Sequence, residues 1–544
     1  MKQISRTHIL GAVLIAALLT VPVNIAMGDA GTDKNTPLPA FSTGAPDNPQ
    51  VATGPICRAK PVEATVVQPT VLNENGDVQI TSETTDQLHP ASVASSNGDI
   101  MAMYENYESL MTGDIGIATS TDGQTWTSAG TIQVPDYRER YPALDIVRGN
   151  KGIGTFASDP RDTVFYYLDM ADVGDVGSMN ISGYDWGSSG YTNPQMASVA
   201  GYGLSEKPTA YFNGLFSYNV DVATSSAEED HSFTYQFYAQ DEGYAQLIYW
   251  HGFGDDLYNI SADIDQKTGH AYWVMEGYNE TNPENFRVRM FSCYIDPELG
   301  GDWWNTDYNF GYINDSIHPD VSAAGGITYL AVEHIEGGFN HNILCYLSTD
   351  DGATWEAVEV AATMDQETDP TIVAYPGGSA SCVYTKNGDL YVSHTTDAGA
   401  TWSDPEQLSE SGAVRPGFGS ADISSGGHVV WQDDQNGNAD IYYDNAGVPG
   451  PLLSIIDVSG GFGITATVAN SGTQAAEDVE YTISFDALIG GTEKTGTVTV
   501  PVDGEVEVKS GFIVGLGPAD ISVEVGGVSA SASGFVLGPF VLGL

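Results

Sequence analysis

A unit of about fifty residues recurs along the chain, and this repeat limits the fold more than any other feature of the sequence. Each unit opens on an apolar strand, and a Gly-containing turn leads to a second strand rich in Tyr, Val and Trp that often ends in an acid. One four-stranded unit of this kind cannot bury both faces of its sheet. Radial packing buries sheet against sheet and leaves few exposed edges, which predicts a β-propeller. Seven units can be located by their opening residue. In six of them a proline follows this residue, which is His89, Tyr141, Lys207, His318, Asp369 or Arg415. The seventh unit opens at Asn259 and lacks the proline.

A short turn motif at the end of some third strands supports this prediction. The pattern Ser/Thr-x-Asp-x-Gly-x-Thr-Trp resembles the Asp box of the sialidase-like BNR-repeat propeller family, and the resemblance covers about residues 61–447. In such a turn Asp and Ser/Thr bond the turn amides, Gly takes a positive φ and Trp packs between blades, so the motif is structural. Two copies are complete: one contains Asp350, Gly352 and Trp355, and the other contains Asp397, Gly399 and Trp402. A third copy, with Asp122 and Trp126, is shorter by one residue.

The resulting prediction is an all-β chain in which a propeller over residues 61–447 precedes a second β-domain. Counting the openings predicts seven blades. Six is the alternative, because the stretch between Asp159 and Asn259 is the least regular. The first strand, near Val66–Ile80, is expected to complete the last blade and close the ring.

The second domain is predicted from alternation that begins after a hinge at Val448–Pro451. Apolar and polar residues alternate in segments such as Gly463–Ala469 and Val479–Phe485, which is typical of a β-sandwich. The turn over Val468–Ala475 resembles the cell-adhesion-related Ig-like modules of archaeal and bacterial surface proteins. The resemblance implies an Ig-like β-sandwich over residues 451–544, which would serve as a spacer or attachment unit.

The N-terminus has the layout of a secretory signal, because Lys2 and Arg6 precede an apolar stretch at Ile9–Met27. Residues 1–30 are predicted to be a signal peptide or an uncleaved membrane anchor, and residues 31–60 a flexible linker. The protein is therefore expected to be secreted or held at the cell surface.

Its 72 acids and 18 basic residues give a formal net charge of -54. This charge repels phosphates and anionic lipid, so nucleic acid is excluded as a partner and membrane contact is expected only through the anchor. Most of the acids are expected to form a hydrated surface.

The predicted strand order brings the openings of the first strands and the ends of the second strands to one face, opposite the Asp boxes. Polar side chains around the mouth of the central channel there form the predicted ligand site. Six tryptophans are either binding platforms at this site or inter-blade core, and the adjacent Trp303 and Trp304 are the best exposed candidates. The six are Trp186, Trp250, Trp273, Trp303, Trp304 and Trp431. The predicted mouth residues are His89, Glu105, Arg140, Lys207, Glu276, His318, Glu333, Asp369, Arg415 and Asp433.

This polar ring predicts a binding or adhesion protein that recognises a glycan or an extracellular protein. Two alternatives are a sialidase-like glycoside hydrolase and a structural component of the cell envelope. The family resemblance implies that a sialidase would hold a sugar carboxylate with three arginines, beside a Tyr/Glu nucleophile and an acid/base Asp. Arg140-Tyr141-Pro142 matches the first arginine motif and Arg415 offers a second arginine. No convincing triad can be assembled, so catalytic residues stay unassigned.

One loop offers metal ligands. Asp434, Asn436, Asn438 and Asp440 place oxygen atoms at every second residue, which indicates a calcium loop. The alternative is a hairpin turn at Asn436-Gly437 with polar flanks, and no Glu closes the series. No other motif requires a cofactor.

Export would permit disulfides among the four cysteines, Cys57, Cys293, Cys345 and Cys382, with buried free thiols as the alternative.

Overall fold

The computed structural model describes residues 66–67 and 77–543, and every regular element in this part of the chain is a strand, so the protein is all-β as predicted. No helix that could cross a membrane occurs among the described residues. Residues 1–60, with the predicted signal, anchor and linker, and Lys207 lie outside them. The gaps in the description are residues 96–97, 110–111, 133–137, 149–150, 160–161, 171, 181–190, 202–211, 224–227, 240–242, 254–255, 279–285, 295–308, 410, 452, 471, 473, 503 and 527.

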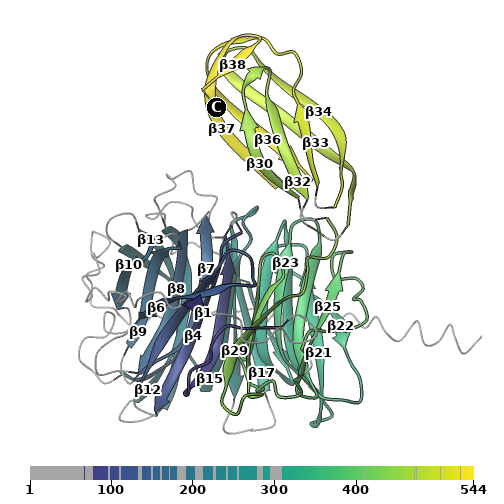
Figure 1. Cartoon of the computed structure of the whole chain (residues 1–544). Helices are drawn as coiled ribbons and strands as arrows, with labels where there is room; N and C mark the ends of the chain where they lie inside the picture. The colour runs from purple at the N-terminus through teal and green to yellow at the C-terminus, as the bar shows by residue number, and fades with distance from the viewer. Residues whose placement is uncertain are drawn as a thin grey trace, which may run out of the picture.

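The strands of the propeller form antiparallel four-stranded units that follow one another along the chain (Figure 1). The first unit contains β3 (Asp86–Ala94), β4 (Ile100–Ser109), β5 (Thr112–Ser120) and β6 (Trp126–Ile132). The second contains β7 (Arg138–Arg148), β8 (Lys151–Asp159), β9 (Asp162–Asp169) and β10 (Asp172–Asn180). A single parallel bridge between Gly113 and Arg138 joins these two units. The next two are β11 (Tyr191–Gly201), β12 (Phe212–Ala223), β13 (Glu228–Ala239), β14 (Gly243–Phe253) and β15 (Asp256–Ile264), β16 (His270–Tyr278), β17 (Phe286–Tyr294), β18 (Asn309–Asn314). Then follow β19 (Ser316–Ala324), β20 (Ile327–Glu336), β21 (Asn340–Ser348), β22 (Glu356–Ala361) and β23 (Glu367–Tyr375), β24 (Ser379–Lys386), β25 (Asp389–Thr395), β26 (Glu406–Gln407).

The last propeller sheet combines both ends of this region. It contains β27 (Ala421–Ser424), β28 (His428–Asp433), β29 (Asp440–Asn445) and β2 (Val78–Gln79). β2 pairs antiparallel with β29, so an early strand completes the last sheet, as the sequence predicted. β1 (Val66–Val67) pairs with β6. The first strands contact one another in turn, from β3 through β7, β11, β15, β19 and β23 to β27, which contacts β3 again. The sheets are therefore arranged around a common axis, as in a β-propeller.

The opening residues lie at bulges in the first strands. His89, Tyr141, Asn259, His318 and Asp369 all have φ between 47° and 53°, and the register of each strand shifts there. A bulge removes a residue from the ladder and redirects its side chain and backbone N–H. Asn259 has the same geometry without a following proline, so the bulge does not depend on the proline.

The ladder register places the acids and the Asp boxes at opposite ends of the sheets. Glu333 in β20 pairs with Ile343 near the start of β21, whereas Ser348, at the end of β21, pairs with Thr328 at the start of β20. The other two box-bearing sheets have the same register. The propeller therefore has a mouth face, with the opening residues and acids, and an Asp-box face.

The aspartates of the three Asp-box turns accept the same pattern of hydrogen bonds, and Trp126 and Trp355 add an indole bond. Asp350 Oδ1 accepts from the Thr354 amide at 2.8 Å and from Ser348 Oγ at 3.0 Å, and Trp355 Nε1 donates to the Gly352 carbonyl at 3.0 Å. Asp397 and Asp122 make equivalent bonds. A Cβ on Gly352 would lie 2.7 Å from Ser292 Oγ of the preceding sheet, so the turn also packs tightly against its neighbour.

Large side chains fill the space between the sheets. Trp273 and Trp431 are fully buried, and Trp273 stacks on Phe291 with ring centroids 5.6 Å apart, so both tryptophans belong to the core and not to a binding surface. Cys293, Cys345 and Cys382 are buried free thiols. Cys57 lies outside the described residues.

The C-terminal region forms two sheets around one core. β30 (Leu453–Ser459), β32 (Thr465–Asn470) and β35 (Gly504–Lys509) form the smaller sheet. The larger sheet contains β31 (Gly461–Phe462), β38 (Phe540–Leu542), β37 (Val528–Gly538), β36 (Gly515–Val525), β33 (Ala476–Ile489) and β34 (Gly491–Val500). Buried residues of both sheets join one cluster, so the two sheets form a sandwich. β36 alternates between buried and exposed at every residue, which is the period that the sequence showed.

The sandwich stands on one end of the propeller (Figure 1). At the junction, a Cβ on Gly450 would lie 3.2 Å from Ser379 Oγ and 3.6 Å from Thr396 Cγ2. The Gln474 amide donates to the Gly450 carbonyl at 3.2 Å. Thr396 belongs to an Asp-box turn, so the sandwich lies on the Asp-box face and the mouth face is on the other side of the propeller.

Candidate functional site

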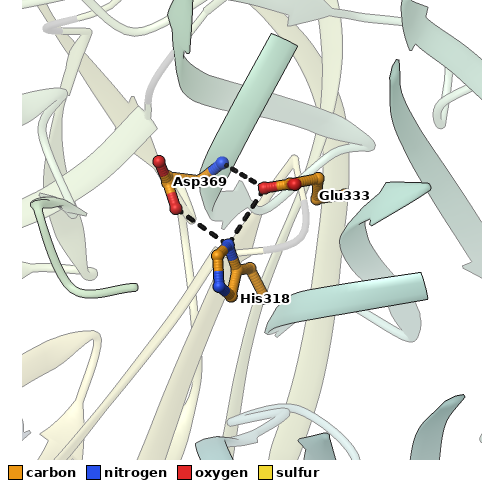
Figure 2. Close-up of side chains that lie close together, drawn as sticks. All are labelled: His318, Glu333 and Asp369. Atoms are coloured by element: carbon orange, nitrogen blue, oxygen red, sulfur yellow. Dashed lines mark hydrogen bonds and ion pairs between the residues drawn. The ribbon is translucent and has the colours of Figure 1, made fainter. Parts of the chain in front are cut away.

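The mouth face brings His318, Glu333 and Asp369 together from three strands, and we call these residues the His318 cluster (Figure 2). His318 lies at the bulge of β19, Glu333 near the end of β20, and Asp369 at the bulge of β23 in the next sheet. His318 Nδ1 is 2.9 Å from Glu333 Oε2 and 2.8 Å from Asp369 Oδ1. Both acids are buried, while 21% of the His318 side chain is exposed. Two acids from adjacent sheets thus meet one ring nitrogen at a point that solvent can reach.

Further hydrogen bonds hold the two carboxylates in place. Glu333 Oε1 is bonded to the His341 ring, and Glu333 Oε2 accepts from the Asp369 amide at 3.0 Å. Asp369 Oδ2 accepts from the Gly417 amide and from Thr368 Oγ1, each at 3.0 Å. The far oxygen of each acid is therefore fixed by the surrounding chain, and Glu333 Oε2, which faces His318, is also held by the Asp369 amide.

The electrostatics of the cluster follow from these contacts. Burial by itself would lower the pKa of His318, but Asp369 and Glu333 raise it to about 10. Burial would raise the pKa of Asp369, but bonds from His318 and the Gly417 amide hold it below its ordinary value. At neutral pH, His318 is therefore a cation between buried carboxylates.

A related cluster occupies the first sheet. His89 Nδ1 is 3.0 Å from Glu105 Oε2, and the His89 ring lies edge-on to Tyr141 with centroids 4.3 Å apart. Tyr141 opens the next sheet, as Asp369 does in the His318 cluster. The other Glu105 oxygen pairs with Arg138, whose guanidinium also lies 4.6 Å from the Tyr107 ring centroid. Burial would raise the pKa of Glu105, but His89 and Arg138 hold it below its ordinary value.

Glu276 connects its own sheet to the His318 cluster. Glu276 Oε2 accepts from Asn259 Nδ2 at 2.7 Å and from the His318 amide at 3.2 Å. The sequence assigned Glu276 to the mouth but did not assign Asn259 as its partner.

The remaining predicted mouth residues have separate partners. Arg415 pairs with Asp434 at 2.8 Å and with Asp86 at 3.1 Å. Asp433 accepts a hydrogen bond from Ser411, and the Arg140 guanidinium lies 5.1 Å from the Tyr141 ring centroid. The charges of Arg138 and Arg415 are thus matched by carboxylates of the chain itself, which weakens attraction for an anionic sugar.

The predicted calcium loop folds as a turn. The Gly437 amide donates to the Asp434 carbonyl at 2.9 Å, and Gly437 has a φ of 99°. Each of the four predicted ligands has a partner outside the set, Asn438 also donates to Asp440 at 3.5 Å, and calcium at this loop stays a prediction. For Asp434, Asn436, Asn438 and Asp440, these outside partners belong to Arg415, Tyr442, Thr85 and Gln79, respectively.

Sequence reasoning missed His341 and Arg138. His341 follows a turn at Gly337–Gly338, and the short hairpin returns it to Glu333. The signal available in the sequence was the order of Glu333, the Gly337–Gly338 turn and His341, which predicts that a short hairpin brings the histidine back beside the acid. Arg138 stands two residues before Arg140, in a stretch where only the second arginine matched a family motif.

The comparisons with known proteins assign a domain to this region. Residues 310–417, which contain the whole His318 cluster, match the BNR repeat-like domain, so the chain carries a BNR-repeat domain. No curated protein sequence matches the chain. Among solved structures, a Dyadobacter fermentans protein of unknown function is similar at 12% identity, over 70% of this chain and 98% of that chain, with a TM-score of 0.38. A Trypanosoma rangeli sialidase mutant displaying trans-sialidase activity is similar at 11% identity, over 89% and 92%, with a TM-score of 0.35. The exo-β-1,3-galactanase of Phanerochaete chrysosporium, solved with galactose, is similar at 13% identity, over 86% and 98%, with a TM-score of 0.31.

Proposed function

We propose that this chain is an exported binding or adhesion protein, in which the mouth of a seven-bladed propeller recognises an extracellular glycan. In this proposal the C-terminal sandwich is an Ig-like module that holds the propeller away from its point of attachment. The observation that carries the proposal is the polar mouth, which lies on the face opposite the sandwich and offers imidazoles and carboxylates in place of unpaired arginines.

The domain assignments have their own support. Among the described residues, the propeller has seven four-stranded units when the nine-stranded sheet is divided into β3–β6 and β7–β10, and the first strands of these units contact one another in a closed series. Two sheets around a shared core, with strict alternation in β36, support the Ig-like assignment. The basic and then apolar N-terminus supports export.

The chemistry of the mouth favours a ligand rich in hydroxyl groups and without negative charge. Carboxylates accept hydrogen bonds from sugar hydroxyls, and the partly exposed imidazolium of His318 donates them. The formal charge of -54 repels anionic ligands over the whole molecule. Arg138 and Arg415 are bonded to Glu105, Asp86 and Asp434, so they do not offset this repulsion.

A glycan array probed with the labelled full chain tests the proposal. We expect neutral glycans to bind, and the double variant His89→Ala/His318→Ala to bind at least tenfold more weakly. The variant Glu356→Ala is the control, because Glu356 is exposed and lies at the Asp-box end of β22. Absence of glycan binding, or equal binding by the double variant, would overturn the proposal. Capture of extracellular protein instead, or release of sugar products detected by mass spectrometry, would favour the protein-binding or hydrolase alternative.

A further inference from the structure

We propose that the His318 cluster binds one divalent transition-metal ion, such as Zn²⁺, through His318 Nδ1, Glu333 Oε2 and Asp369 Oδ1, and that the proton on Nδ1 is released to solvent when the ion binds. Ligand atoms of these three residues all lie within 4.8 Å of one another. This inference does not depend on the glycan proposal, because it concerns the chain and the ion alone.

The strongest argument is the convergence of two acids on one ring nitrogen (Figure 2). The oxygens lie 2.9 Å and 2.8 Å from the same Nδ1 atom. A single N–H group points at one acceptor in a good hydrogen bond, so one proton cannot serve both oxygens equally well. A metal ion placed among the three atoms would contact all of them. Zinc bonds of about 2.0–2.2 Å in a tetrahedral arrangement place neighbouring ligand atoms roughly 3.3–3.6 Å apart, so each oxygen would move about 0.5 Å away from Nδ1 when the ion binds.

The surroundings of the two acids have the form of an outer ligand shell. Metal-bound carboxylates are usually held by a further hydrogen bond that orients them. Here the His341 ring bonds the far oxygen of Glu333, and the Gly417 amide and Thr368 hydroxyl bond the far oxygen of Asp369. The oxygens that face His318 are thereby held in position before any ion binds.

The donor set selects the class of metal. One imidazole and two carboxylates suit zinc and related transition metals, whereas calcium takes oxygen ligands only. Three protein ligands leave at least one position for water or another ligand. The partly exposed His318 side chain provides an access path from the mouth.

The first sheet supplies a built-in comparison. His89 and Glu105 repeat the His–Glu contact at 3.0 Å, but Tyr141 stands where Asp369 would be. Arg138 already places a positive charge on Glu105. A second cation there would lack the third ligand and would be repelled by the guanidinium, so we expect no metal at this pair.

The test uses the full chain, stripped with a chelator, dialysed and titrated with Zn²⁺ in a calorimeter, with elemental analysis of the loaded protein. We expect one Zn²⁺ per chain in a tight step. His318→Gln and Asp369→Asn should each weaken that step at least tenfold, while His89→Gln should leave it unchanged. Cobalt loading should give visible absorption bands that His318→Gln abolishes and His89→Gln preserves.

Circular dichroism and thermal melting of each variant establish that it is folded, and His318→Gln carries the test if Asp369→Asn does not fold. The proposal is overturned if the folded wild-type chain shows no one-to-one step, or if that step survives in His318→Gln. Weak binding of several ions, equal in wild type and His318→Gln, would also overturn it, because such binding reflects exposed acids. None of these readouts involves a glycan, so failure here leaves the glycan proposal intact.

Discussion

The backbone N–H of Asp369 donates to Glu333 Oε2 at 3.0 Å, which ties the first strand of one sheet to the second strand of the sheet before it. His318 makes the same bond to Glu276, and His89 makes it to the side chain of Gln432. The bulge turns each opening N–H out of its own ladder and toward the neighbouring sheet. The polar groups of the mouth therefore join the sheets, in addition to any ligand that they bind.

Glu333→Gln should destabilise the protein by about 3 kcal/mol, because it breaks a buried ion pair and leaves His318 and His341 without their shared carboxylate. The free energy of unfolding in urea measures the effect. Glu356→Gln removes the same charge from an exposed position and should change stability by less than about 0.5 kcal/mol. Equal effects of the two substitutions would show that the Glu333 contacts do not stabilise the propeller.

Gly352→Ala should cost more stability than Gly338→Ala, although the two glycines have similar φ values of 80° and 82°. The cost of a positive φ is common to both. A Cβ at Gly338 meets nothing within 4 Å, whereas at Gly352 it would lie 2.7 Å from Ser292 Oγ. Overpacking of this kind costs about 1–3 kcal/mol, and the difference between the two melting curves reports it. A larger loss at Gly338 would contradict tight packing of the Asp box.

Stability should fall as pH rises from about 4 to about 8, because three acids of the first strands are buried. Burial raises the pKa of Asp263 to about 8, of Asp422 to about 7 and of Asp145 to about 6, and each lies above the value of the unfolded chain. Through these acids the folded state binds more protons in this window and loses that advantage as each acid ionises. Burial lowers the pKa of His428 to about 4, which opposes the trend below pH 6.5 but involves one group against three.

Urea unfolding at several pH values tests this trend. Asp263→Asn should flatten the slope, and the slope should persist in high salt, which screens exposed charges more than buried ones. Stability that increases between pH 5 and pH 8 would contradict the prediction.

The three described thiols should resist a disulfide reagent in the native protein at about pH 8 and react fully in denaturant, since the thiolate is the reactive form. Burial raises the pKa of Cys293 and of Cys345 to about 12, and that of Cys382 well above its ordinary value. A Cys57→Ser chain removes the remaining cysteine from the assay. Rapid labelling of one of these thiols in the folded state would show that its sheet opens.

Much of the architecture could be predicted because its signals are local. The Asp350 and Asp397 turns require particular residues at fixed spacing, and the bond networks around these two acids are the same. The alternation in β36 has the two-residue period of a strand with one buried face. The mouth membership of His318 and Glu333 also followed from strand order, because the ends of neighbouring strands meet on one face.

The sequence by itself determined the repeat and the strand periods, because each depends on neighbours along the chain. Only the tertiary structure decided which residues meet, such as Arg415 with Asp86, 329 positions apart. It also buried Asp145, Asp263 and Asp422, although the composition alone predicted a hydrated surface for most acids. Contacts between sheets depend on how the blades pack around the axis, and no local spacing in the sequence encodes that packing.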